Sequence, residues 1–418
     1  MAQPVLATNA EHLSLGSGEA EAGIRFVLNL ALALHRFGTP AHRIEEVMVV
    51  LCRRLGIVGR FVSTPTSISA SFGPPEALRS TLIRADPGEV DLNRLALLDG
   101  LVNQVLQGRC GIVEGTWRLD EILAAPSRYG PSVIVTFYSV CACFGAQLFG
   151  GGLAEMVAAT VLGAFVGVLA VLAGRHPGFG RVLEPAAAFG SSALAVVGAR
   201  LVAPYSTGIA TLAALIFLLP GLTLSVAMTE VATRNLISGT SRLTGATLVF
   251  LQLGFGVALG QHVDMFLPAG PTHVEVVPLP AWVYPITLFM VVLSLAILFR
   301  ARLRDTGFIL IAGGLAYAAS RVGAQYLGSE LGAFVGALAL GITSNVYGRL
   351  LDRPALVLNT VGIMLLVPGS LGYRSLESLI QADLLPGIDL AFRSVLVLVA
   401  LSGGVLVANS IVPPRRLL

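Results

Sequence analysis

A Pro-Gly pair interrupts an apolar segment at two places in this chain, and polar residues follow each pair closely. The first pair, Pro220-Gly221, lies in LIFLLPGLTLSVAMTEVATRNLISG, and the second, Pro368-Gly369, lies in GIMLLVPGSLGYRSLESLIQADLLPG. The position numbers of the two prolines differ by 148, without a gap in the segments that follow them. A helix breaker inside a membrane is costly unless the freed backbone groups face protein or water. Breakers in corresponding positions of two halves therefore predict a transporter binding site.

The chemistry expected at these breaks is the binding of a small polar or anionic solute. Each break starts a new half-helix whose free N–H groups and positive dipole end would stabilise a carboxylate. Nearby hydroxyl groups can hydrogen-bond a substrate hydroxyl or amine, or can instead bond between helices. The predicted substrate-binding residues are Pro220, Gly221, Thr223, Ser225, Pro368, Gly369, Ser370 and Tyr373.

Charged residues near the same segments are the second class of candidate, because burying a charge in a membrane is expensive. Glu230 and Arg234 lie one turn apart after the first break, and Arg374 and Glu377 occupy the equivalent stretch after the second. Such acid–base pairs can serve as an alternating gate or as proton-coupling carboxylates. The alternative is an interfacial salt bridge of little consequence.

Two further polar residues lie inside predicted apolar spans. Arg321 either extends to the outer interface or meets an anionic substrate, and Asn359 has a weaker claim to a role. The six histidines are scattered and the four cysteines form no Cys/His ligand set, so we expect neither a metal site nor a disulfide framework. The sequence holds no catalytic pair and no hydrolase, nucleotide or dinucleotide motif, so we expect a protein that is not an enzyme and has no cofactor.

The elements that position these residues must be membrane helices. Hydrophobic residues make up 55% of the 418 residues, charged residues 12%, and the mean hydropathy is +0.81. Much of the charge lies before residue 129, where helical periodicity alternates with segments rich in β-branched residues. The first twenty residues lack the pattern of a cleavable signal peptide. We therefore predict a disordered tail (1–20), a cytoplasmic α/β (α+β) domain (21–128), a transmembrane repeat (129–263), an extracytoplasmic loop (264–281) and a second transmembrane repeat (282–418).

Ten apolar windows are long enough to cross a bilayer. Arginines gather in alternate loops, which by the positive-inside rule places those loops and both chain ends in the cytoplasm. The predicted spans are 131–149, 153–173, 186–203, 207–228, 243–261, 282–300, 307–327, 331–348, 354–373 and 390–412. Five spans in each half invert the second copy across the membrane, so both breaks lie near the midplane. The predicted fold is a membrane all-α protein of ten transmembrane helices in two five-helix inverted repeats.

From about Phe26 to its end the chain resembles the threonine/serine exporter family of bacterial amino-acid exporters. The segments that carry the resemblance are FVLNLALALHRFGTPAHRIEEVMVVLCRRLG, VSTPTSISASFG, GEVDLNRLALLDGLVNQVLQG, PGLTLSVAMTEVATRNLISGTSRL and LVPGSLGYRSLES. The resemblance implies export of small hydroxy-amino acids driven by the proton-motive force, with ten spans and a cytoplasmic N-terminal domain. The family often carries Asp nine residues after the first Pro-Gly glycine, where this chain has Glu230.

We therefore expect a secondary exporter of threonine, serine or similar amino acids in the bacterial inner membrane. Its expected partners are the amino-acid substrate, protons and the lipid bilayer; the sequence also allows a homo-oligomer but points to no nucleic acid. Three alternatives remain open. Related two-component members of the family make a small dicarboxylate the second substrate candidate. The second is a membrane sensor without transport, and paired breaks favour transport over sensing. The third is an intramembrane enzyme, which is weaker because the sequence places no catalytic pair or zinc ligands at midplane depth.

Overall fold

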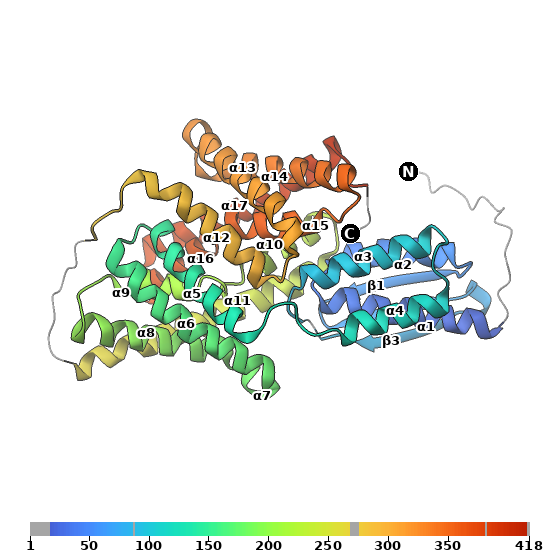
Figure 1. The fold of residues 1–418 in the computed structure, drawn as a ribbon, viewed down its shortest axis with the longest axis horizontal. Helices are drawn as coiled ribbons and strands as arrows, with labels where there is room; N and C mark the ends of the chain where they lie inside the picture. Colours follow the sequence, from blue (N-terminus) through green and yellow to red (C-terminus); the bar gives the residue numbers. More distant parts are fainter. Residues whose placement is uncertain (1–16, 87, 268–275, 381–382, 416–418) are drawn as a thin grey trace. The chain divides into compact units, whose positions relative to one another are not determined.

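A computed structural model describes residues 17–86, 88–267, 276–380 and 383–415, and these are mostly helical (Figure 1). They divide into two compact units. One contains the described residues up to Glu89 together with Leu97–Ala125, and the other contains Val90–Ala96 and the described residues from Pro126 onward. Most of the predicted tail (1–20) and the centre of the predicted loop (264–281) lie outside the described residues, but residues 17–20 belong to a helix.

The first unit combines helices with a small three-stranded antiparallel sheet in the order β1-β2-β3. Alternate residues of β2 are buried, as the alternating sequence pattern predicts. Cys52 is also buried, which raises the pKa of its thiol to about 12 and keeps it protonated at neutral pH. The elements are α1 (Ser17–Arg36), α2 (Ala41–Arg54), β1 (Gly59–Thr64), β2 (Ser67–Phe72), β3 (Arg79–Arg84), α3 (Leu92–Leu106, from Leu97 in this unit) and α4 (Ile112–Ala124), with a 3-10 turn at Pro75–Ala77.

The second unit, from Pro126 onward, is helical throughout its described elements. Its helices are α5 (Pro131–Leu148), α6 (Leu153–Arg175), α7 (Pro177–Gly180), α8 (Leu183–Leu201), α9 (Thr207–Ala214), α10 (Gly221–Ala232), α11 (Leu236–Gln261), α12 (Tyr284–Leu298), α13 (Leu303–Leu327), α14 (Ser329–Leu351), α15 (Leu356–Leu366), α16 (Gly369–Ile380) and α17 (Leu384–Ile411). Short 3-10 helices lie at His262–Phe266 and Ala281–Val283.

Eight helical segments among the described residues are long and apolar enough to cross a membrane, compared with the ten that the sequence predicts. The two predicted spans outside this count are 186–203 and 207–228. The first falls on α8, which carries Glu184 and Arg200 near its ends and many Ala, Gly and Ser residues. The second is divided by the turn before Pro220 into α9 and α10, and each of these is too short to cross alone.

Lipid-facing surfaces are visible in the burial pattern of the long helices. On α6, Leu153, Val157 and Val161 are exposed, whereas the opposite face buries Glu155, Met156 and small residues. A soluble helix shows the reverse pattern, with polar residues outside. Apolar side chains outside and small or polar ones inside are the arrangement that a hydrocarbon solvent requires.

Small residues set equivalent helix contacts in the two halves of this unit. A Cβ atom placed on Gly256 of α11 would lie 2.6 Å from the Pro185 carbonyl oxygen and 2.8 Å from the Ala188 Cβ in α8. A Cβ on Gly404 of α17 would lie at the same distances from the Phe334 oxygen and Ala337 Cβ in α14. These two glycines are also 148 positions apart. The α8–α11 and α14–α17 pairs therefore pack with the same atomic register.

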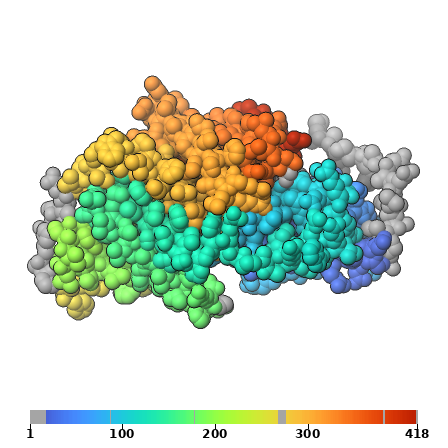
Figure 2. All heavy atoms as spheres, viewed as in Figure 1, coloured from blue at the N-terminus to red at the C-terminus, as the bar shows by residue number. Residues whose placement is uncertain are grey.

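Other pairs of neighbouring helices also have equivalents in the two halves. In the first half α10 packs on α11, and α9 packs on α6 and α8; in the second half α16 packs on α17, and α15 packs on α13 and α14. Across the halves, α5 packs on α12, α10 on α17, and α11 on α16. Teal-to-green residues of the first half directly adjoin gold-to-orange residues of the second at the surface in Figure 2. Residues 131–261 and 284–411 thus form two similarly packed halves of one unit.

Close packing at Gly404 predicts that an added methyl group destabilises the protein more there than at the neighbouring Gly403. Gly404→Ala forces a methyl group against backbone atoms of α14 and should lower the free energy of unfolding by about 1–3 kcal/mol. Gly403→Ala is the matched control, because the nearest atom to its Cβ is 3.7 Å away in the Phe334 ring. Thermal unfolding of the purified protein in detergent measures both, and equal melting temperatures would contradict this packing.

Candidate functional site

Both Pro-Gly pairs break their helices in the structure. In the first half α9 ends at Ala214, residues 215–220 form turns, and α10 starts at Gly221. In the second half α15 ends at Leu366, Val367 is extended, and α16 starts at Gly369. Both following half-helices are 12 residues long. Proline cannot donate the backbone hydrogen bond that would continue the preceding helix, and a new half-helix starts directly after each proline, as the sequence predicts.

The two breaks contact each other. A Cβ atom placed on Gly221 would lie 2.3 Å from Cγ1 of Val367, the residue before Pro368. A Cβ on Gly369 would lie 3.4 Å from the Leu219 Cβ and 3.9 Å from the Gly221 Cα. The two prolines and the two glycines are all buried. Two segments far apart in the sequence thus cross with their backbones nearly touching, which glycine permits because it has no side chain.

Protein atoms satisfy the carbonyl groups of both prolines. The Pro368 carbonyl oxygen accepts hydrogen bonds from the Gly372 N–H at 3.0 Å and from the Ser394 hydroxyl of α17 at 3.2 Å. The Leu224 N–H donates to the Pro220 carbonyl oxygen at 3.0 Å. The crossing is therefore a stable feature of the buried interior, as a broken membrane helix requires.

Three of the polar side chains singled out by sequence have buried atoms without a hydrogen-bond partner among the described residues. They are the Ser225 hydroxyl, the Tyr373 hydroxyl and the Asn359 amide oxygen. Ser225 lies one turn after Gly221, and Tyr373 lies one turn after Gly369, at equivalent positions of the two half-helices. A buried polar atom without a partner costs free energy, so these atoms are candidates for a hydrogen bond to a water molecule or a ligand. Thr223 and Ser370 are partly buried nearby.

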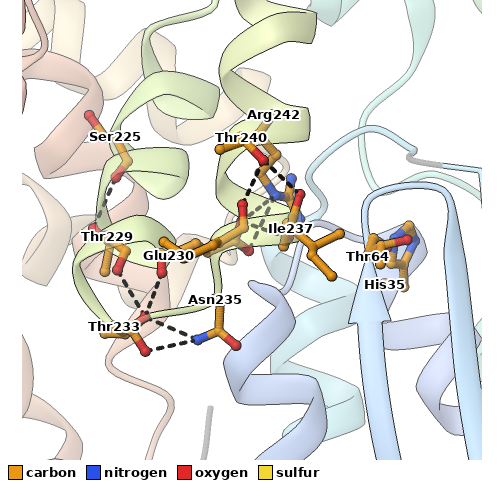
Figure 3. A network of polar contacts seen from close by, with 12 residues as sticks. His35, Thr64, Ser225, Thr229, Glu230, Thr233, Asn235, Ile237, Thr240 and Arg242 are labelled. Carbon is orange, nitrogen blue, oxygen red and sulfur yellow. Dashed lines mark hydrogen bonds and ion pairs between the residues drawn. The ribbon is translucent and has the colours of Figure 1, made fainter.

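Glu230 is fully buried near the end of α10 and lies in a dense polar network (Figure 3). Its carboxylate accepts a hydrogen bond from the Ser238 hydroxyl at 2.7 Å. The Arg242 Nε donates to both carboxylate oxygens, at 3.2 and 3.1 Å. Both partners are on α11, so the network closes the hairpin between α10 and α11.

The predicted one-turn pair of Glu230 with Arg234 is replaced by this network. Helix α10 ends at Ala232, and Arg234 adopts a left-handed backbone conformation with φ of 66°. A side-chain pair four residues apart needs a continuous helix, which the turn interrupts. Arg234 is exposed, and Arg242, which follows on α11, takes the position beside the carboxylate.

In the second half, Glu377 lies in a small pocket between α11 and α16 that is partly open to the outside. The predicted pairing of Glu377 with Arg374 gives way to a different contact. Arg374 is exposed, donates to the Phe149 carbonyl oxygen at 3.2 Å and lies 6.0 Å from the centre of the Phe149 ring. The pocket is lined by Gly254, Val257, Ala258, Gln261, Tyr373, Glu377 and Ile380.

Arg321 is exposed on α13 rather than buried among the polar residues described above. Gln147 and Asp305 are examples of buried polar groups that the sequence pattern did not single out. Gln147 of α5 accepts a hydrogen bond from the Thr287 hydroxyl of α12, which joins the two halves. Asp305 accepts hydrogen bonds from the Tyr347 hydroxyl, at 2.9 Å, and from Arg353. A polar residue inside an apolar segment, the signal that marked Asn359, would also have marked Gln147.

No group of three or more His, Cys, Asp or Glu residues in the described part of the chain is arranged to hold a metal ion. The polar atoms of the site are instead hydroxyl, amide and carboxylate groups spread over several helices. Such groups can bind a small polar molecule by hydrogen bonds and ion pairs.

Curated yeast membrane proteins are similar to this chain over most of its length. A pheromone-regulated membrane protein 10 of Yarrowia lipolytica is 28% identical over 86% of this chain and 30% of its own length. One of Saccharomyces cerevisiae is 27% identical over 85% of this chain and 47% of its own length. The chain thus spans less than half the length of these relatives. No solved structure matches it.

Two family models match successive parts of the chain. The model described as a putative threonine/serine exporter matches residues 25–263, and a second one described as a threonine/serine exporter matches residues 285–411. Each match contains one of the two Pro-Gly breaks. Together they cover nearly all of the chain, and the first alone covers more than half of it. This protein belongs to the threonine/serine exporter family.

Proposed function

We propose that this protein exports threonine, serine and similar small amino acids and that it binds them beside the crossing of its two Pro-Gly breaks. The observation that carries the proposal is the contact of Gly221 with Val367, with the unpartnered Ser225 hydroxyl one turn away. The half-helix N-termini at this crossing attract a substrate carboxylate. A substrate hydroxyl bonded to Ser225 offsets the cost of a buried group without a partner.

The proposed architecture is ten spans in two inverted five-helix repeats. The eight long apolar segments are completed by α8 as the third span and by α9 with α10 as the fourth. The matching glycine contacts of the α8–α11 and α14–α17 pairs support the repeat. Because each half then has an odd number of spans, the halves have opposite orientations, and the two breaks lie near the membrane midplane.

The proposed orientation puts both chain ends in the cytoplasm and places the protein in the bacterial cytoplasmic membrane. Arginine-rich loops follow α6, α12 and α14, whereas the segment between α5 and α6 contains no arginine. This asymmetry supports the orientation. Bacterial location stays a prediction from sequence, since the curated relatives named above are yeast proteins. Energy for export would come from the proton-motive force, as the resemblance to the exporter family implies.

Counterflow in proteoliposomes tests the substrate. Vesicles loaded with unlabelled threonine should accumulate external labelled threonine, whereas vesicles loaded with succinate should not. Protein-free vesicles and vesicles with a Pro220→Leu/Gly221→Leu variant are the controls, since a continuous helix removes the crossing. Accumulation driven by succinate and not by threonine would replace the amino-acid assignment with export of a dicarboxylate.

A compensating pair of substitutions tests whether the crossing exists in the working transporter. Gly221→Ala places a methyl group against Val367 and should slow threonine counterflow, and adding Val367→Ala should restore most of the rate. In thermal unfolding the two changes should show a coupling energy of about 0.5–3 kcal/mol. Gly369→Ala is the matched control, with 3.4 Å to its nearest neighbour. A double variant no better than Gly221→Ala alone would argue against the contact.

Two serines of equivalent burial separate a binding role from a structural one. Ser225→Ala removes a hydroxyl with no protein partner. It should raise the threonine concentration that gives half-maximal counterflow about tenfold, without loss of stability. Ser375→Ala removes a hydroxyl that donates to the Gly387 carbonyl oxygen at 2.7 Å and should cost about 1 kcal/mol of stability. Titrated counterflow and thermal unfolding distinguish them. Destabilisation by Ser225→Ala with unchanged half-saturation would assign Ser225 a structural role.

A further inference from the structure

Two carboxylates after the breaks have opposite environments. Glu230 is 0% exposed and bound by Arg242 through both oxygens. Removing one partner of a buried ion pair is strongly unfavourable, so Glu230 and Arg242 together hold α10 to α11. A carboxylate that carries a proton through a transport cycle must instead lie outside such a closed ion pair.

Glu377 meets that requirement. It is partly buried in the pocket between α11 and α16, and the cation on its own helix, Arg374, is turned to Phe149. One turn before it lies Tyr373, whose hydroxyl is buried without a partner and lines the same pocket. A phenol hydroxyl can donate a hydrogen bond to a charged carboxylate and accept one from a neutral carboxyl group. The pocket can thus accommodate both protonation states of Glu377.

The rest of the pocket adds no charged side chain. From α11 it receives Gly254, Val257, Ala258 and the neutral Gln261. His262 follows Gln261 and is exposed, with its ring nitrogen 2.8 Å from the Ala258 carbonyl oxygen. On α17, Asp389 and Arg393 pair with each other at 2.9 Å and are exposed. From α9, the backbone at Gly208 approaches the Glu377 carboxylate. Tyr373 and Arg374 are the titratable neighbours on α16.

Resting on the transport function proposed above, we infer that Glu377 is the proton-binding carboxylate of the transport cycle, loaded through the pocket that it shares with Tyr373 and Gln261. Gln261 ends α11 and Ile380 ends α16, so the pocket lies at that end of both helices. In the proposed orientation this end faces the extracytoplasmic side. A hydronium ion from that side gives its proton to a Glu377 carboxylate oxygen and leaves water. In the inward-facing state the O–H bond breaks and the proton passes to cytoplasmic water, while the amino acid moves outward.

The test reconstitutes full-length wild type, Glu377→Gln, Glu377→Asp and Asp389→Asn in vesicles containing a pH dye. Two quantities are measured: counterflow of labelled threonine at equal pH, and the internal pH change that follows a threonine gradient. Wild type, Glu377→Asp and Asp389→Asn should show both, the last because its carboxylate is exposed and paired outside the pocket. Glu377→Gln should keep counterflow and lose the pH change.

Either of two results overturns the inference. A threonine-induced pH change in Glu377→Gln equal to that of wild type would place proton binding elsewhere. Loss of counterflow in Glu377→Gln, with thermal unfolding unchanged, would make Glu377 a substrate ligand. If Glu377→Gln does not fold, Glu377→Asp is the variant that decides. Its shorter side chain must keep the pH change. Loss of the pH change with counterflow intact would contradict proton binding by the carboxylate at this position. Absence of threonine counterflow in wild type would reject the proposed function, separately from the role of Glu377.

Discussion

The second unit depends on one constraint: backbone polar groups within a hydrocarbon layer must find partners inside the protein. Two helices that stop at Pro-Gly pairs violate it unless their ends are enclosed. The structure encloses them by crossing one break over the other, so that Gly221 lies against Val367 and Ser394 bonds the Pro368 carbonyl oxygen. The surrounding helices must approach closely to bury this crossing, which accounts for the small residues along α8, α11, α14 and α17.

The two halves share a helix-packing arrangement but carry different polar side chains at equivalent positions. The 148-residue offset relates Ser225 to Tyr373 and relates Thr229 to Glu377. Gly256 and Gly404 occupy equivalent positions under the same offset, and a methyl group at either one would strike backbone atoms. In the second half, Tyr373 and Glu377 line a pocket that the helix packing leaves open. One half therefore presents a small hydroxyl group and the other a phenol beside a carboxylate.

The two glutamates illustrate how environment assigns a role to the same side chain. Glu230 is enclosed with a cation and a hydroxyl group from α11, which makes it part of the scaffold. Glu377 lies in a pocket whose other lining side chains are uncharged, and Arg374 on the same helix donates its hydrogen bond to the Phe149 carbonyl oxygen. By spacing alone, each glutamate is the acid of an acid–base pair on one helical face. The structure distinguishes the two, because α10 ends at Ala232 and because Arg374 donates to Phe149.

The sequence by itself determined the membrane character, the positions of the breaks and the equivalence of their surroundings, because composition and proline act locally. It also marked Ser225, Tyr373 and Glu230 as unusual, since polar groups in apolar segments are costly wherever they lie. Tertiary structure decided the partners: Arg242 for Glu230, Phe149 for Arg374, and Thr287 for the unexpected Gln147. It also set the lengths of the short helices into which the two broken spans divide. Partners separated by 12, 225 or 140 positions meet through helix packing, which no local pattern encodes.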